Sequence, residues 1–432
     1  MTKNKKILAL LSTTALLSLG SIVTVFASTG WQKENNTWKY YDKDGYAVTD
    51  TWKKDGNEWF FLNEYGNMAV DTLVEDGDAY YYVDASGCMV KNAWRLAEDE
   101  EGDYYWYYFQ SSGKAKDDGF LIINNEKYHF TDYKMDSGWI QDGDKTYYLN
   151  NDENDASYGS VKSGWVYVDD FDDDDDVSAD EEGWYYFQSS GKLITNDEKK
   201  INGHYYVFDD NGLMLDNWVE FTNSTATNSD AESSLYKYYN TSNGDRAEGW
   251  LYLDDMSSDE GRETEEGWYY FKKGIAYAPG YKTTSIADGY AVAKISGKIY
   301  CFDETGKMVT GKVNGDSDTY YYFDEDGVMK YGKVKITDSD DLDDGTYYFV
   351  DKGSLGEKGQ SGTGVIKGYL YDNGELVTAE DGMKYEKVTV DGKDYLVNES
   401  GKVKTSGTVK DDNGVKWTVT KDSGGNYIIT SE

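Results

Sequence analysis

One short pattern recurs along the chain, and this repetition constrains the fold more than any other feature. The first three copies are "WKYYDKDGYAVTDTW" (38–52), "WFFLNEYGNMAVDTL" (59–73) and "YYYVDASGCMVKNAW" (80–94). Each joins an aromatic cluster to a polar turn ending in glycine, followed two positions later by an apolar residue. The turn glycines Gly45, Gly66 and Gly87 are 21 residues apart, and Gly306 and Gly327 keep the same step. A fixed period near 20 residues predicts a repeat architecture.

Each copy predicts a β-hairpin. Segments such as "WYYF" are rich in residues that favour strands. In turns such as "DKDG" and "DASG", a final glycine enters the left-handed region without strain and joins two strands. Met68, Met89 and Met308 are examples of the apolar position in the second strand. Because one hairpin is unstable alone in water, it must pack on the next. The predicted fold is therefore all-β, an elongated β-solenoid of stacked β-hairpin repeats of about 20 residues.

A longer repeat lies over the short one in the middle of the chain. Similar segments begin at Trp94, Trp165 and Trp250, and each contains a short strand, an acidic insert and a second aromatic strand. We expect the three acidic loops to project from equivalent places. The predicted organisation is N-terminal hairpin repeats at 28–93, triplicated long repeats with acidic loops at 94–312, C-terminal hairpin repeats at 313–380 and a C-terminal cap at 381–432.

Residues 1–27 are predicted to be a secretory signal peptide. Lys3, Lys5 and Lys6 precede an apolar stretch that ends in the small-residue site Val25-Phe26-Ala27, which is the pattern of a cleaved signal. The alternative is an uncleaved anchor, since the stretch approaches the length that spans a bilayer.

Composition excludes several classes of protein. The 432 residues carry a formal charge of −38, which should repel nucleic acid and attract cations. Disordered chains are poor in aromatic residues, whereas this chain has 16%, so it can bury surface in many small packets. Cys88 and Cys301, the only cysteines, lie in distant repeats, and we interpret them as small apolar filling residues.

The combined pattern resembles the cell-wall-binding repeat family, which includes choline-binding modules of Gram-positive surface proteins, glucan-binding repeats and clostridial toxin repeats. Gly-Trp pairs such as Gly138-Trp139, Gly164-Trp165 and Gly249-Trp250 carry the resemblance, together with "WYYF…G.M…W". It covers nearly all of residues 31–408. It implies a β-solenoid that holds choline on teichoic acid, or a glycan, between neighbouring repeats. Beyond Trp268 the only Trp is Trp417, so the C-terminal third is more similar to glucan- and toxin-type repeats.

The resemblance implies aromatic cages for a quaternary ammonium group, whose charge is attracted to ring faces. Each cage would combine a closing Trp with rings from the following strand and the adjoining repeat. The candidate ligand-binding residues are Trp52 with Trp59 and Tyr82; Trp139 with Tyr147; Trp165 with Trp184 and Tyr186; and Trp250 with Trp268 and Tyr270. The alternative for any one ring is a place in the core. The same rings would also suit the apolar face of a sugar, and the sequence does not separate these ligands.

No other chemistry is predicted. "DDFDDDDD" (169–176) lacks the spacing that fixes a calcium site, so we interpret it as a solvated charge run. His129 and His204 lie too far apart for a metal site and are interpreted as structural. Carboxylate pairs are uninformative in a chain with 81 acidic residues, and no triad spacing has a scaffold. We therefore expect no catalytic residue, metal or cofactor.

These features favour a secreted, non-catalytic protein associated with the cell wall. Its expected partner is choline-bearing teichoic acid or wall glycan, with no nucleic acid and no membrane contact after signal cleavage. The sequence leaves homodimer formation open. The alternative is an adhesin or toxin-like repeat protein that binds host-cell glycans, and a wall hydrolase would require an unrepeated domain that we do not find.

Overall fold

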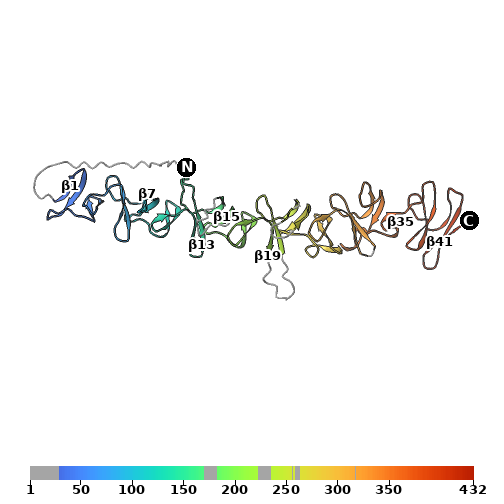
Figure 1. Ribbon diagram of the computed structural model, residues 1–432. Helices are drawn as coiled ribbons and strands as arrows, with labels where there is room; N and C mark the ends of the chain where they lie inside the picture. Colours follow the sequence, from blue (N-terminus) through green and yellow to red (C-terminus); the bar gives the residue numbers. More distant parts are fainter. Residues whose placement is uncertain (1–28, 170–181, 222–234, 255, 258–262, 317) are drawn as a thin grey trace. The chain divides into compact units, whose positions relative to one another are not determined.

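The computed structural model describes residues 29–169, 182–221, 235–254, 256–257, 263–316 and 318–432. The predicted signal peptide lies outside these residues, as do nearly all of the acidic run at 169–176 and most of the third acidic insert. The described part of the chain contains strands and turns and no helix, so the all-β prediction is confirmed (Figure 1). Accordingly, no helix long and apolar enough to cross a bilayer occurs within these ranges.

The strands are short and follow one another along the chain. They are β1 (Gly30–Glu34), β2 (Thr37–Tyr41), β3 (Thr51–Asp55), β4 (Glu58–Leu62), β5 (Thr72–Glu75), β6 (Tyr80–Val83), β7 (Ala93–Glu98), β8 (Tyr104–Phe109), β9 (Gly119–Ile123), β10 (Glu126–Thr131), β11 (Lys134–Met135), β12 (Gly138–Asp142), β13 (Lys145–Leu149), β14 (Gly164–Val168), β15 (Gly183–Phe187), β16 (Asp197–Ile201), β17 (His204–Phe208), β18 (Met214–Leu215), β19 (Asn217–Phe221), β20 (Leu235–Tyr239), β21 (Gly249–Leu253), β22 (Met256–Ser257), β23 (Glu263–Thr264), β24 (Gly267–Lys272), β25 (Ile275–Ala276), β26 (Thr284–Ala287), β27 (Tyr290–Ile295), β28 (Lys298–Phe302), β29 (Met308–Val309), β30 (Gly311–Asn314), β31 (Tyr320–Phe323), β32 (Gly332–Ile336), β33 (Gly345–Phe349), β34 (Gly364–Ile366), β35 (Tyr369–Asp372), β36 (Glu375–Leu376), β37 (Glu386–Val390), β38 (Lys393–Val397), β39 (Gly407–Lys410), β40 (Lys416–Lys421) and β41 (Tyr427–Ser431).

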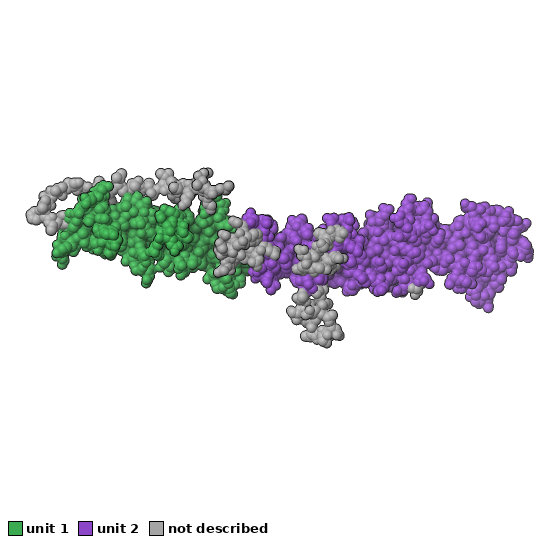
Figure 2. Space-filling model, in the orientation of Figure 1, with its two compact units in different colours: residues 1–166, 170–178, 186–193 green, residues 167–169, 179–185, 194–432 purple. Residues whose placement is uncertain are grey.

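The chain divides into two compact units (Figure 2). Unit 1 contains residues 1–166, 170–178 and 186–193, and unit 2 contains residues 167–169, 179–185 and 194–432. Within each unit most sheets have only two or three antiparallel strands, and the largest, β32-β33-β36-β35-β34, has five. Each unit is therefore a series of small sheets.

The main hairpin of each repeat joins the strand before the aromatic cluster to the aromatic strand itself. β1 pairs antiparallel with β2, which places Trp31 opposite Tyr40. The two-residue turn between them, Asn35-Asn36, has φ angles of 47° and 67°. Two successive positive φ values are typical of the tight hairpin turns that match the strand twist, and Asn tolerates them well.

The Asp-x-x-Gly turn follows this hairpin, which corrects the sequence-based assignment. Gly45 has a φ of 79°, as predicted for the left-handed region, and its N–H donates to the carbonyl of Asp42. However, the turn leads only to an isolated bridge between Tyr41 and Ala47. The turn reverses the chain so that one residue pairs with the aromatic strand. The chain then continues to the next hairpin.

A backbone hydrogen bond links each repeat to the one before it. The N–H of Met68, two positions after the turn glycine, donates to the carbonyl of Trp38 in the preceding hairpin at 2.7 Å. The N–H of Met329 donates in the same way to Ile299 at 2.8 Å. Because these bonds use only main-chain atoms, they recur where the side chains differ.

The core is divided into small clusters, as the composition predicts. One cluster in unit 1 contains Tyr82, Tyr107 and Phe109. A cluster in unit 2 contains Phe323 and Cys301. Cys301 is fully buried, in agreement with its interpretation as a filling residue, and burial raises the pKa of its thiol to about 12.

Candidate functional site: an aromatic groove between hairpins

Trp250 lies at the centre of a three-ring arrangement in unit 2. It follows Gly249 at the start of β21, and its partner across the hairpin is Tyr270 in β24, with ring centroids 5.1 Å apart. The third ring is Tyr300, which comes from β28 in the next hairpin and lies 4.7 Å from Trp250 at an interplanar angle of 64°. Two successive repeats therefore share these rings.

Strand alternation exposes these rings on one face of the hairpin. Successive side chains point to opposite faces of a strand, so Trp250 and Tyr252 share a face in β21, and Trp268 and Tyr270 share it in β24. The intervening Tyr269 is buried in a core cluster on the opposite face. This explains how one aromatic segment supplies both a core and an exposed surface.

Three of the rings, Trp250, Trp268 and Tyr300, line an open groove of about 380 Å³. Its lining residues are Trp250, Trp268, Tyr300, Met308, Glu325 and Asp326. Trp268 is 46% exposed, and the two carboxylates belong to the exposed turn after β31. The groove therefore combines three ring faces, a polarisable thioether and an acidic rim.

The turn glycine of the next repeat leaves the space that Met308 occupies. A Cβ added at Gly327 would lie 2.3 Å from the Sδ of Met308, a distance that real atoms do not share. Glycine therefore permits this approach, in addition to supplying the φ of 75° that the turn requires.

This combination suits a small organic cation. Ring faces attract a cation with about 0.5–2 kcal/mol per contact, and Met packs well around irregular apolar groups. Glu325 and Asp326 add favourable charge at the rim, while an uncharged methyl-bearing group would gain only the apolar contacts. The groove needs no acid–base residue to bind such a group.

Part of this groove lies in a segment that matches a known protein family. Residues 291–330 match a family model described as a choline-binding repeat, and this segment contains Tyr300, Met308, Glu325 and Asp326 from the groove lining. Residues 137–154 and 179–193 match a model described as a putative cell wall binding repeat. These segments of the chain match cell-wall-binding repeats.

Solved structures from Streptococcus pneumoniae are similar to this chain. The modular autolysin LytC, in complex with a synthetic peptidoglycan ligand, is 19% identical over 65% of this chain and 52% of its own, with a TM-score of 0.37. Choline binding protein F is 22% identical over 81% of this chain and 99% of its own, with a TM-score of 0.29. The choline-binding domain of Spr1274 is 30% identical over 21% of this chain and 95% of its own, with a TM-score of 0.17.

The match spans about half the length of LytC. All three TM-scores are below 0.5. No curated protein matches the chain.

Unit 1 contains the same arrangement around Trp94. Trp94 in β7 lies 5.1 Å from Tyr108 across its hairpin and 5.0 Å from Tyr128 in the next hairpin, at 65°. Trp106 lies 6.5 Å from Trp94, and Met135 packs against the same cluster. These residues hold the positions of Trp250, Trp268, Tyr270, Tyr300 and Met308.

Four residues of these arrangements were not among the predicted ligand-binding residues: Trp94, Trp106, Tyr300 and Met308. The signal for these residues was present, because the triplicated block aligns Trp94 with Trp250 and "YYWYYF" with "GWYYF". The third ring was harder to find, since it requires knowing which face of the next hairpin meets the closing Trp.

The predicted group of Trp52, Trp59 and Tyr82 needs a correction of one residue. Trp52 and Trp59 lie on one face of the β3–β4 hairpin, because Trp59 is two positions from Phe61, the partner of Trp52. The ring that meets Trp52 from the next hairpin is Tyr81, at 5.1 Å. Tyr82 points to the opposite face, where it is 8% exposed.

The predicted pair of Trp139 and Tyr147 is also separated by strand alternation. Trp139 lies opposite Tyr148, with ring centroids 5.0 Å apart. Tyr147 points to the other face and lies 4.9 Å from Phe120 of the preceding hairpin. An assignment shifted by one residue selects the wrong face of a strand.

The four remaining candidates make two kinds of ring contact; they are Trp165, Trp184, Tyr186 and Tyr270. Trp165 lies 5.0 Å from Tyr186, and Tyr270 contacts Trp250. Trp184 lies 5.2 Å from Tyr167 and is 45% exposed, an arrangement that matches Trp268 with Tyr252 at 5.4 Å.

The two histidines each have a carboxylate partner. The Nδ1 of His129 lies 2.6 Å from an oxygen of Asp136, and that of His204 lies 2.7 Å from Asp245. No cluster of three or more His, Cys, Asp or Glu residues with the geometry to hold a metal ion occurs in the described ranges.

Proposed function

We propose that this protein is a secreted, non-catalytic cell-wall-binding protein that attaches to choline-bearing wall polymers through the aromatic grooves between its hairpins. The observation that carries the proposal is the groove of Trp250, Trp268, Tyr300 and Met308, whose acidic rim complements a quaternary ammonium group. The overlap of this groove with the matched choline-binding repeat supports the same ligand.

The proposal includes the finer architecture that the groove requires. Within each unit, the hairpins would form a β-solenoid in which every groove lies between consecutive repeats. The recurring main-chain bond, as between Met68 and Trp38, supports this arrangement because it fixes each hairpin against its predecessor.

Wall glycan is the second ligand that the groove would accept. The solved LytC structure holds a synthetic peptidoglycan ligand, and choline binding protein F has been solved in the presence of a peptidoglycan analogue. For this chain, the exposed pair of Tyr252 and Trp268, with the Tyr252 hydroxyl donating to Glu266, would suit a sugar ring beside the cation.

The decisive test compares choline with 3,3-dimethyl-1-butanol, which has the same shape and no charge. Calorimetric titration of the full chain should show choline binding at least about tenfold more tightly, because the ring faces and the acidic rim act on the positive charge. Trp250→Leu should remove one site and leave the fold intact, since Leu retains apolar packing. Equal affinity for the two ligands would contradict the cation cage.

Three further measurements complete the test. Tyr46→Ala changes a ring that is 73% exposed and lies outside the groove, so choline binding should not change. Incubation with isolated walls should show retention that free choline reverses, whereas retention that choline does not reverse would indicate glycan. Zymography on wall material should stay blank, and a clearing band would contradict the non-catalytic assignment.

A further inference from the structure

A site in unit 1 repeats the geometry of the Trp250 groove with different residues. Phe120 follows a glycine of positive φ at the start of β9, as Trp250 does in β21. Its ring centroid lies 4.6 Å from His129, its partner across the hairpin. Tyr147 of the next hairpin lies 4.9 Å away at 64°, matching the 4.7 Å and 64° between Trp250 and Tyr300.

A cation of the chain itself occupies this second site. The Nζ of Lys127 lies 3.6 Å from the ring centroid of Phe120 and 4.7 Å from that of Tyr147. It also donates to the carbonyl of Ser190 at 3.5 Å. Burial lowers the pKa of Lys127, partly offset by the charge of Asp142. The ammonium group therefore lies where the ring faces would hold a ligand cation.

We propose that the site formed by Phe120, His129 and Tyr147 is a further cation cage whose resident cation is Lys127. The site is closed to small ammonium ligands while Lys127 is present and opens to them when that side chain is shortened. The ligand class rests on the proposed function, but the occupation by Lys127 does not. The chain thereby limits choline-type binding to the repeats whose cages have no internal cation.

Tethering explains why the lysine excludes a free ligand. An intramolecular partner on a short tether has an effective concentration on the order of millimolar or higher. Lys127 lies on β10, next to β9, which carries Phe120, so the ammonium group cannot diffuse away. A free cation must displace it before contacting the rings.

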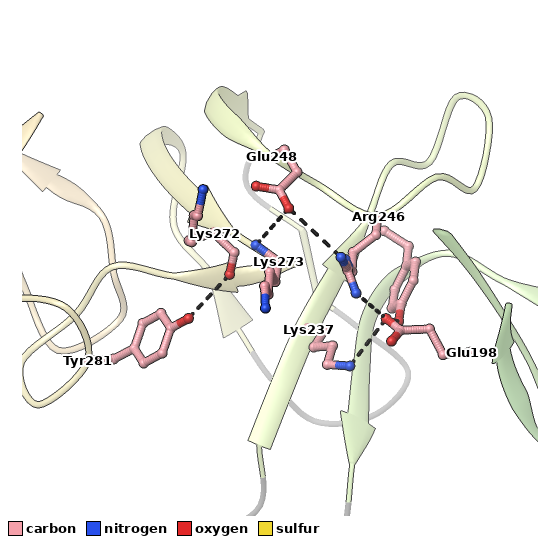
Figure 3. Close-up of polar contacts among 8 residues, drawn as sticks. Glu198, Lys237, Arg246, Glu248, Lys272, Lys273 and Tyr281 are labelled. Atoms are coloured by element: carbon pink, nitrogen blue, oxygen red, sulfur yellow. Dashed lines mark hydrogen bonds and ion pairs between the residues drawn. The ribbon is translucent and has the colours of Figure 1, made fainter. Parts of the chain in front are cut away.

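A hairpin of unit 2 also holds cations of the chain itself at the equivalent position, where a carboxylate binds them (Figure 3). Glu198 takes the position of Phe120 as the second residue of its hairpin, and its Oε1 accepts from Arg246 at 2.9 Å and Lys237 at 3.2 Å. The Tyr239 hydroxyl donates to the same oxygen at 2.7 Å. The guanidinium carbon of Arg246 lies 4.1 Å from the ring centroid of Tyr205.

The ionisation of Glu198 follows from these contacts. Burial alone would raise the pKa of its carboxyl, but hydrogen bonds from Tyr239 and Arg246 and the charge of Lys237 outweigh it, and the pKa is lowered. Glu198 therefore stays charged and holds both cations in place. Two repeats thus contain internal cations at the position where Trp250 forms an open groove.

The test compares two substitutions of Lys127 by calorimetric titration with tetramethylammonium. Lys127→Ala vacates the cage, so the full chain should bind about one more tetramethylammonium ion than the wild type. Lys127→Met removes the same charge but keeps the cage filled, so it should gain no site. Thermal unfolding in each titrated state shows whether the variants fold, and saturating tetramethylammonium should raise the melting temperature more for Lys127→Ala than for Lys127→Met.

A second readout reports Lys127 without any added ligand. After ¹³C reductive methylation of the wild type, the methyl signal of Lys127, assigned by Lys127→Arg, should be shifted upfield by the ring currents of Phe120 and Tyr147. If the wild type binds tetramethylammonium and Lys127→Ala gains nothing, the inference is wrong and the proposed function stands. If neither chain binds tetramethylammonium, the proposed function fails. The methyl signal then tests separately whether Lys127 occupies the cage, and an unshifted signal overturns that occupation.

Discussion

At the scale of single residues, neighbouring positions in one strand serve opposite purposes. Tyr81 meets Trp52 on the exposed face, whereas Tyr82 is buried and its hydroxyl donates to Asp71 at 2.9 Å. Burial and this hydrogen bond to a carboxylate raise the pKa of Tyr82 to about 12. The chain therefore uses Tyr both as a surface ring and as a protonated core group.

Tyr82 should make the fold sensitive to alkali. Its folded pKa lies above its unfolded value, so the unfolded state loses the proton first and the contribution to stability falls as the pH rises from about 10 to about 12. Urea unfolding at about pH 9 and about pH 11 should show a larger loss for the wild type than for Tyr82→Phe. Tyr65→Phe, at a ring that is 69% exposed, should behave as the wild type. Parallel losses in all three chains would contradict the assignment.

At the scale of elements, the groove is built from successive repeats. Trp250 comes from β21, Tyr300 from β28, and the acidic rim from the turn after β31. A single hairpin therefore contains only part of a site. The turn glycine links these parts, because Gly327 leaves the space that Met308 occupies.

Gly327→Ala should weaken ligand binding as well as the fold. The added Cβ would displace Met308 from the groove and strain a backbone with φ of 75°, and strain of this kind costs about 1–3 kcal/mol. Gly332→Ala is the matched control, because its φ is 78° but no atom lies within 4 Å of the added Cβ. Choline affinity should fall only for Gly327→Ala, and an equal effect of both substitutions on affinity would exclude the role of Met308.

At the scale of the whole molecule, the proposed sites would act together on a strongly acidic chain. The arrangement of Trp250 in unit 2 recurs around Trp94 in unit 1. Several cation sites on one chain bind a polymer more tightly than any single site binds its ligand. The formal charge of −38 should also disfavour bare polyanions, so recognition of an anionic wall polymer would depend on its cationic groups.

Removing both sites should therefore affect wall binding more than binding of free choline. Trp94→Leu and Trp250→Leu should each remove one choline site without changing the affinity of the sites that remain. The double variant should bind choline-bearing walls on the order of 100-fold more weakly, as measured by sedimentation with labelled protein. If the double variant binds walls as well as either single variant, the sites do not act together.

The sequence predicted the repeat unit better than it predicted the contacts between units. Glycine spacing located the left-handed turns at Gly45 and Gly327, and aromatic content predicted strands at the right places. The predicted contacts between hairpins were wrong by one residue at Tyr82 and Tyr147. Side chains alternate between the two faces of a strand, so consecutive tyrosines, as in "YYYV", offer a ring on either face.

The sequence pattern did not predict the internal cations. Lys127 is one of 43 basic residues, and nothing in "NNEKYHF" distinguishes it from a solvated lysine. The place of Lys127 between aromatic rings depends in part on Tyr147, which belongs to a different hairpin. The turn that carries Glu325 and Asp326 is likewise distant from Trp250 in sequence and adjacent only in the fold.

The main-chain bond between repeats has a consequence for how such a chain can change over generations. Since Met68 and Met329 each bond to the preceding hairpin through peptide groups, a copied segment could form the same bond wherever it was inserted. Gene duplication could therefore lengthen the protein in whole steps. This main-chain bond would tolerate aromatic, acidic or basic residues at the start of each hairpin. Each copy could therefore change its ligand while keeping its bond to the preceding hairpin.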